Sequence, residues 1–198
     1  MESIANNKKI VQVLNFLAIK EGGQIGKLKA MKLVWLADRL HLRKYLRTIT
    51  HDSYFAMKNG PVPSRTKDIA EGNEFVDEQI KSYRDSYIEL DSKNPIIISK
   101  KEVDTMKFSD SDEEILTEIY NQFGHYSSTQ LVTLSHKFPE WKKYQSNNKK
   151  SRIPIKDIEF FENPINNSIS IFHESDELLE LGKDIYLENQ AISNAIFG

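Results

Sequence analysis

The segment that most constrains the fold of this chain is the amphipathic stretch over residues 26–45. Its apolar residues recur at spacings of three and four, which predicts a helix. They form one stripe, made of Leu28, Met31, Val34, Trp35, Leu42 and Tyr45 and widened by Leu33, Leu36, Ala37 and Leu40. Because a stripe this wide needs neighbours on more than one side, we expect this helix near the centre of the core.

A single carboxylate interrupts that stripe. Asp38 precedes Leu42 by about one helical turn, on the face that the apolar residues share. A carboxylate in such a place is desolvated unless it is paired or hydrogen-bonded. We therefore expect a buried anchor, bonded to the strand at Tyr54 or to the turn amides near Gly60. The alternative is a partner-binding or catalytic carboxylate.

The rest of the chain is predicted to form short helices and a few strands. Capping boxes, Ser111-x-x-Glu114 and Ser127-x-x-Gln130, start two of the helices. The predicted helices cover residues 7–20, 26–45, 63–70, 111–123, 127–137, 139–144, 155–161 and 176–192; the predicted strands cover 54–57, 87–90, 96–98 and 168–171, and residues 73–82 and 145–152 are predicted loops. This predicts an α+β fold, mainly α: a helical domain with one small antiparallel sheet formed by the first three strands.

Charge is segregated along the chain although the net charge is −2. Basic residues dominate 26–47 and 137–156, and acidic residues dominate 71–91 and 157–198. Such blocks are expected to attract one another within the fold, and the alternative is a basic face for nucleic acid or an acidic partner. No stretch reaches the length of a membrane span, and the N-terminus lacks the order of a signal peptide. We expect a cytoplasmic protein with no membrane partner.

Motifs for chemistry are absent from the sequence. GGQIG at 22–26 lacks the residues of a phosphate-binding loop, and neither HExxH nor GxSxG occurs. With no cysteine, thiolate chemistry and disulfides are excluded. The best metal candidate would combine Asp38, His41, His51 and Asp52, but ordinary polar contacts explain these residues better. We expect no catalytic residue, no metal, no cofactor and no small-molecule substrate, and hence no enzyme.

A DNA-binding function is the rival interpretation. The predicted helices 7–20 and 26–45 are separated by Gly22-Gly23, and with the later hairpin they suggest a winged helix–turn–helix. The second helix is basic enough to lie near phosphate. Its wide apolar stripe argues against this, since a recognition helix must leave one face free for the groove.

Three segments together resemble the Panacea, or SocA-like, antitoxin domain. They are MKLVWLADRLHLRKY (31–45), HDSYFAMKNGPVPS (51–64) and GHYSSTQLVTLSHKFPEWKKY (124–144), and the resemblance covers roughly residues 7–145. The chain departs from the pattern in the basic run over 42–47, where many relatives have a glycine-containing turn. The positions that carry the resemblance, called the signature residues below, are Lys32, Trp35, Asp38, His41, Tyr54, Gly60, Pro61, Pro63, His136 and Trp141.

The resemblance implies a bacterial or phage-encoded antitoxin that binds and neutralises a toxin protein encoded by an adjacent gene. Operator DNA is a further partner to consider, and an adaptor that delivers the toxin to a protease is an alternative role. The signature residues are expected to define the fold more than the toxin contact.

The resemblance also divides the chain. We expect a family domain over 1–145 and a C-terminal extension over 146–198 that packs on it. The predicted toxin contact lies on the acidic C-terminal helix, and the alternative is that its apolar residues pack on the protein's own core. The candidate partner-binding residues are Leu178, Leu181, Ile185, Glu177 and Asp184.

Overall fold

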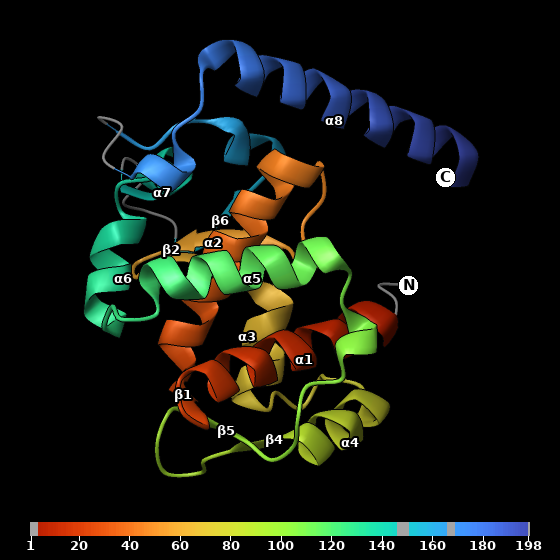
Figure 1. The fold of residues 1–198 in the computed structure, drawn as a ribbon, viewed down its shortest axis with the longest axis vertical. Helices are drawn as coiled ribbons and strands as arrows, with labels where there is room; N and C mark the ends of the chain where they lie inside the picture. Colours follow the sequence, from red (N-terminus) through yellow and green to blue (C-terminus); the bar gives the residue numbers. More distant parts are fainter. Residues whose placement is uncertain (1–3, 146–150, 166–168, 198) are drawn as a thin grey trace.

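The computed structural model describes residues 4–145, 151–165 and 169–197. Figure 1 shows their arrangement. The α-helices are α1 Ile4–Lys20, α2 Lys27–Tyr45, α3 Ser64–Glu71, α4 Glu78–Tyr87, α5 Asp110–Phe123, α6 Ser128–Ser135, α7 Pro139–Gln145 and α8 Asp176–Phe197. The strands are β1 Gln24–Gly26, β2 Tyr54–Met57, β3 Gly60–Pro63, β4 Ile88–Leu90, β5 Ile96–Ser99 and β6 Ile153–Ile155, and the short 3-10 helices are η1 Thr105–Lys107, η2 Asp157–Phe161 and η4 Ser170–Phe172.

Helix α2 is the central element, as its wide apolar stripe predicts. Residues 30–42 are buried in an unbroken run. The helix contacts α1, α3, α5, α6, the edge strand β3 and η2, and in Figure 1 it passes behind α5 through the middle of the molecule. The predicted fold class, α+β and mainly α, is confirmed.

The strands form two small sheets where the sequence predicted one. The hairpin β4–β5 pairs with β1, in the order β1-β5-β4, whereas β2 lies between β3 and β6 in a separate sheet. All pairings are antiparallel, and Tyr54 lies opposite Pro63 on one side and Ile155 on the other. Two prolines hide β3 from pattern analysis, although an edge strand tolerates them because its outer amides need no partner.

Two helix starts differ from their predictions. Residues 78–87 form α4, capped by Asp77, where the sequence predicted loop to 82 and strand from 87. Its polar sequence buries little besides Ile80 and so gives a weak apolar period. Helix α5 is capped by Ser109 with Asp112 in place of the predicted Ser111 and Glu114. The capping box of Ser127 with Gln130 is confirmed at α6.

The C-terminal segment packs through short turns and one long helix. The predicted strand at 168–171 is wrong over residues 169–171, because Ile169 is not in a strand and Ser170–Phe172 is a 3-10 helix that buries Phe172; residue 168 lies outside the described residues. The predicted helix at 155–161 is the 3-10 helix η2, preceded by β6. The predicted basic loop falls partly on 146–150, which also lie outside the described residues. Helix α8 runs along the outside of the molecule, and its C-terminal end stands apart from the other helices (Figure 1).

Candidate functional site

Asp38 is a buried anchor for the segment that follows α2. Its carboxylate accepts hydrogen bonds from the amides of Ile49 (2.7 Å) and Thr50 (3.1 Å) and from the hydroxyls of Thr50 and Tyr54. Burial raises the pKa of Asp38 to about 6, although the four hydrogen bonds act in the opposite direction. The expected bond to the Tyr54 strand is present, and the amides that bind Asp38 are those of residues 49 and 50 instead of those near Gly60.

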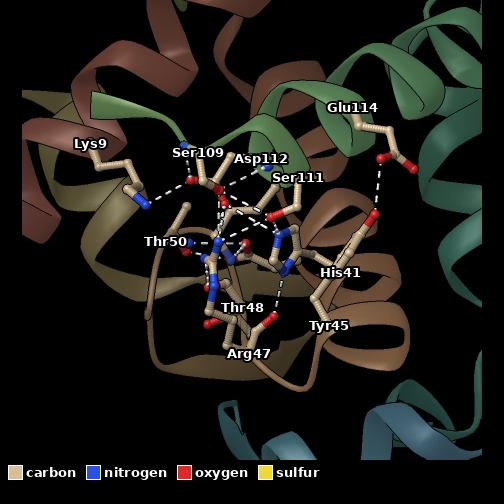
Figure 2. Close-up of polar contacts among 12 residues, drawn as sticks. Lys9, His41, Tyr45, Arg47, Thr48, Thr50, Ser109, Ser111, Asp112 and Glu114 are labelled. Carbon is tan, nitrogen blue, oxygen red and sulfur yellow. Dashed lines mark hydrogen bonds and ion pairs between the residues drawn. The ribbon is translucent and has the colours of Figure 1, made fainter. Parts of the chain in front are cut away.

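His41 joins α2 to a cluster of charges around Asp112 (Figure 2). Lys9 and Arg47 lie 2.8 and 2.9 Å from the buried Asp112 carboxylate, and His41 Nε2 lies 3.3 Å from it. Burial alone would raise the pKa of Asp112, but the hydrogen bonds from His41 and Lys9 outweigh it and hold that pKa well below its usual range. The cluster therefore ties α1, α2 and the following loop to the first turn of α5.

The same cluster contains a hydroxyl beside an imidazole. Ser111 Oγ lies 3.0 Å from His41 Nε2, and His41 Nδ1 donates to the carbonyl oxygen of Arg47 at 2.7 Å. That spacing suits a nucleophile and its base. However, the His41 side chain is fully buried, and Asp112 lies against the same ring nitrogen. We interpret His41 as a junction among α2, the loop and α5.

Lys32 and Gly60 are fixed by one tight contact between α2 and the β2–β3 hairpin. The buried Lys32 Nζ donates to the carbonyl oxygen of Pro61 at 2.7 Å, and burial lowers the pKa of Lys32 to about 7. Gly60 has a φ of +97°, and a β-carbon there would overlap Ser135 Oγ and lie 2.7 Å from Lys32 Nζ. Both the backbone angle and the lack of space require glycine.

The aromatic signature residues pack around the same hairpin. Trp35 is fully buried with its ring edge-to-face against Phe138, at 4.8 Å between centroids. His136 stacks on Trp141 at 3.6 Å, and Trp141 Nε1 donates to the carbonyl oxygen of Met57 at 2.9 Å. The three sequence segments that carry the signature residues thus meet at α2, and the contacts described above join them to other parts of the same chain.

Two arginines that sequence analysis did not single out connect α2 to the C-terminal segment. Arg39 Nε donates to Glu140 Oε1 at 2.9 Å, with both side chains fully buried. Arg39 also donates to the carbonyl oxygen of Glu162 and lies 4.6 Å from the ring centre of Phe138 and 5.3 Å from that of Phe172. Glu140 is the sole acid within the basic block 137–156. That isolation is the sequence feature that could have indicated a buried ion pair.

The second of these residues, Arg43, lies one helical turn further along α2. It donates to the carbonyl oxygen of Phe172 at 2.6 Å and to Asn163 Oδ1 at 2.9 Å. Burial, followed by the nearby charge of Arg39, lowers the pKa of Arg43 to about 9. Arg39 and Arg43 are therefore both bound by the segment that leads into α8.

Three of the four residues weighed as metal ligands serve separate side-chain contacts, and the fourth, His51, is exposed. Asp52 caps α3, accepting from the amides of Arg65 and Thr66 at 2.8 and 2.7 Å, while Asp38 and His41 bind the partners described above. In residues 4–145, 151–165 and 169–197, no group of three or more histidine, aspartate or glutamate side chains is placed to hold a metal ion.

The candidate partner-binding residues lie on the open side of α8. Leu178, Leu181 and Ile185 are 57, 56 and 38 % exposed, and Glu177 and Asp184 are exposed beside them. The helix packs on the body through a different set of positions. Leu179 and Tyr186 are buried, Gly182 faces Phe161, and the Tyr186 hydroxyl donates to Asp157 at 3.1 Å. The apolar stripe that the sequence indicated is therefore not the face that packs on the core.

Comparison with known protein families identifies the family to which this chain belongs. A model of the family described as "Antitoxin SocA-like, Panacea domain" matches residues 30–142, more than half of the 198 residues. This chain belongs to the SocA-like Panacea family. The matched span holds all ten signature residues, and α8 lies beyond its end. No curated protein and no solved structure gives a match. Among the helices of the described part of the chain, none combines the length and the apolar composition needed to cross a membrane.

Proposed function

We propose that this Panacea-family protein is the antitoxin of a bacterial or phage toxin–antitoxin pair and that it neutralises its toxin by direct protein–protein binding. The observation that carries the proposal is the family match over residues 30–142. The structure supports a non-enzymatic role, because Asp38, His41 and Lys32 are buried and serve contacts within the fold. A partner can bind the surface of the chain, above all the open side of α8.

The burial of α2 is evidence against DNA as the main partner. A recognition helix must leave one face free for the groove, and α2, the basic helix that would serve, is buried from residue 30 to residue 42. Two of its cations, Lys32 and Arg39, are fully buried, and Arg43 binds the C-terminal segment. Operator binding would therefore need another surface of the antitoxin or of its complex with the toxin.

We also propose a division of labour along the chain. The family domain over 1–145 supplies the scaffold, because the signature residues lie there and contact one another around α2. The extension over 146–198 supplies the contact that is specific for one toxin. It lies beyond the family match, and its α8 exposes apolar side chains that the fold does not use.

The deciding experiment uses the product of the adjacent gene. That product is expressed alone and together with this chain, and growth is scored. We expect arrest when it is expressed alone and growth when the two are expressed together. Arrest that persists with both proteins present, or an adjacent product that is harmless alone, would contradict the proposal.

The toxin level in rescued cells separates two ways of rescue. Neutralisation by binding predicts an unchanged amount of toxin that co-purifies with this chain. An adaptor for a protease predicts that the toxin level falls, and that it recovers in cells lacking the protease. Rescue with a falling toxin level would replace neutralisation by delivery as the mechanism.

A further inference from the structure

Helix α8 carries an apolar seam along its open side. Leu178, Leu181, Ile185 and Ile192 follow one another at spacings of three, four and seven residues, which are the a and d positions of a coiled-coil heptad. They are all exposed. We call this set of four residues the α8 seam. The d position between Ile185 and Ile192 is the acidic Glu188, so this seam is narrower than the stripe of a core helix and suits pairing with one further helix.

The α8 seam leads into an apolar hollow beside the body. The hollow measures about 250 Å³, and Leu178 belongs to both the hollow and the seam. Its lining residues are Leu40, Arg43, Lys44, Phe161, Ile171, Glu174, Leu178 and Leu179. A partner helix on the seam can therefore seat one large apolar side chain in the hollow at the base of α8.

The surface around the seam is acidic. Helix α8 contains five acids, Asp176, Glu177, Glu180, Asp184 and Glu188, against Lys183 alone, and Lys183 Nζ already lies 3.5 Å from Glu180. Beyond Lys44, which lines both sites, a second and wider hollow is lined by Asp110, Glu113, Glu114 and Glu118 of α5. Lys44 itself lies 2.8 Å from Glu118.

Charge decides which kind of helix fits there. Glu177 and Asp184 each precede an a position, so they flank the seam at positions g, where interhelical ion pairs form. A second copy of α8 would bring five more acids to the same surface and would be repelled. A helix with lysine or arginine at its flanking positions would meet opposite charges along residues 176–188, which also steers its approach.

From these contacts, and resting on the proposed function, we propose that α8 is the toxin-docking element and that its occupant is a basic amphipathic helix of the toxin. The apolar residues of that helix pack on the α8 seam and enter the hollow at Leu178. Its cations face Glu177 and Asp184.

The first test uses the toxin and a matched pair of charge reversals. Glu177→Lys/Asp184→Lys changes the surface beside the seam, whereas Glu89→Lys/Glu102→Lys makes the same change in net charge at exposed acids elsewhere. We expect the α8 double variant to bind toxin about tenfold more weakly and to lose rescue, and the control to keep both. Rescue and affinity that survive in the α8 variant would overturn the docking site while leaving the antitoxin function in place.

The second test does not depend on the toxin. The full-length protein is titrated with two synthetic helical peptides that share leucines at a and d and carry either lysines or glutamates at e and g. We expect the lysine peptide to bind about tenfold more tightly at about 0.1 M salt and the difference to shrink at about 1 M, where screening is stronger. We also expect Leu181→Glu to abolish binding. Equal binding of both peptides, or binding of neither, would overturn the proposal.

Sedimentation of the free protein checks the competing occupant. We expect a monomer, because two acidic seams repel. A dimer that Leu181→Glu dissociates would make a second copy the occupant of the seam and overturn the proposal. Peptide binding together with failed rescue would contradict the antitoxin function alone, so failure of the function and failure of the surface are distinguishable.

Discussion

Helices α2 and α8 are both long and both mix apolar with charged residues, yet the molecule uses them in opposite ways. Helix α2 is buried over thirteen consecutive residues, from 30 to 42. The buried side chains of α8 include Leu179 and Tyr186, while Leu178 and Leu181 on its other side are more than half exposed. The difference lies in the width of the apolar stripe, because a wide stripe needs several neighbours and a narrow seam needs one.

The polar residues of the two helices differ in burial, as their apolar residues do. Asp38, Arg39 and His41 of α2 are fully buried and hydrogen-bonded to other parts of the chain. Glu177 and Asp184 of α8 are exposed to solvent. Substitutions in α2 are therefore expected to change the stability of the fold, and substitutions on the open side of α8 to change binding at nearly constant stability.

The largest effect is expected at the buried pair of Arg39 and Glu140. Glu140→Leu should lower the free energy of unfolding by about 3–5 kcal/mol, because it leaves the Arg39 charge buried without its partner. Urea unfolding followed by circular dichroism measures this loss. The double variant Arg39→Met/Glu140→Leu is the control and should recover most of the stability. A loss below about 1 kcal/mol in the single variant would show that the pair is not desolvated.

The second-largest loss of stability is expected for substitution of Asp38. Asp38→Ala removes an acceptor from two amides and two hydroxyls and should cost roughly 1–3 kcal/mol. The melting temperature should fall, and toxin neutralisation should fall in proportion to the folded fraction. Thermal denaturation and growth rescue of the same variant give both values. An Asp38→Ala protein that is fully stable but inactive would make Asp38 a contact residue instead of an anchor.

Lys32 should give the stability of the protein a distinctive pH dependence. Burial lowers the pKa of Lys32 to about 7 from a usual value of 10.5, so between pH 7 and 9 the unfolded chain holds a proton that the folded chain has released. The free energy of unfolding should therefore rise with pH in this window, by up to about 1.4 kcal/mol per pH unit.

Lysine substitutions isolate that contribution. Lys32→Met should flatten the rise between pH 7 and 9, whereas Lys93→Met, at an exposed lysine, should retain it. Urea unfolding at several pH values measures both slopes. A rise that persists unchanged in Lys32→Met would assign the released proton to a different group.

Much of this contrast could be predicted from the sequence, and the reason is local periodicity. The stripe around Trp35 placed α2 in the core, and Asp38 within it indicated an anchor. What could not be predicted depends on contacts distant in sequence. Tyr54 pairs with Ile155, and Arg39 meets Glu140 about a hundred residues away.

Which face of α8 packs on the core could likewise not be predicted from the sequence. Periodicity placed Leu178, Leu181 and Ile185 on one side of a helix but could not say whether that side faces the core. The answer depends on Gly182, whose lack of a side chain lets Phe161 pack close to α8 and so selects the adjacent face for burial. Helix α4 was missed for a related reason, since Ile80 is nearly alone in packing it inward.

The most direct test of the account compares two neighbouring leucines of α8. Leu179 is 8 % exposed and Leu181 is 56 % exposed. Leu179→Ala should cost about 2 kcal/mol of unfolding free energy and leave the toxin affinity of the folded protein unchanged. Leu181→Ala should change stability by less than about 0.5 kcal/mol and weaken toxin binding about tenfold, measured by calorimetric titration. Wild-type affinity in Leu181→Ala would contradict the claim that the open side of α8 is the binding surface.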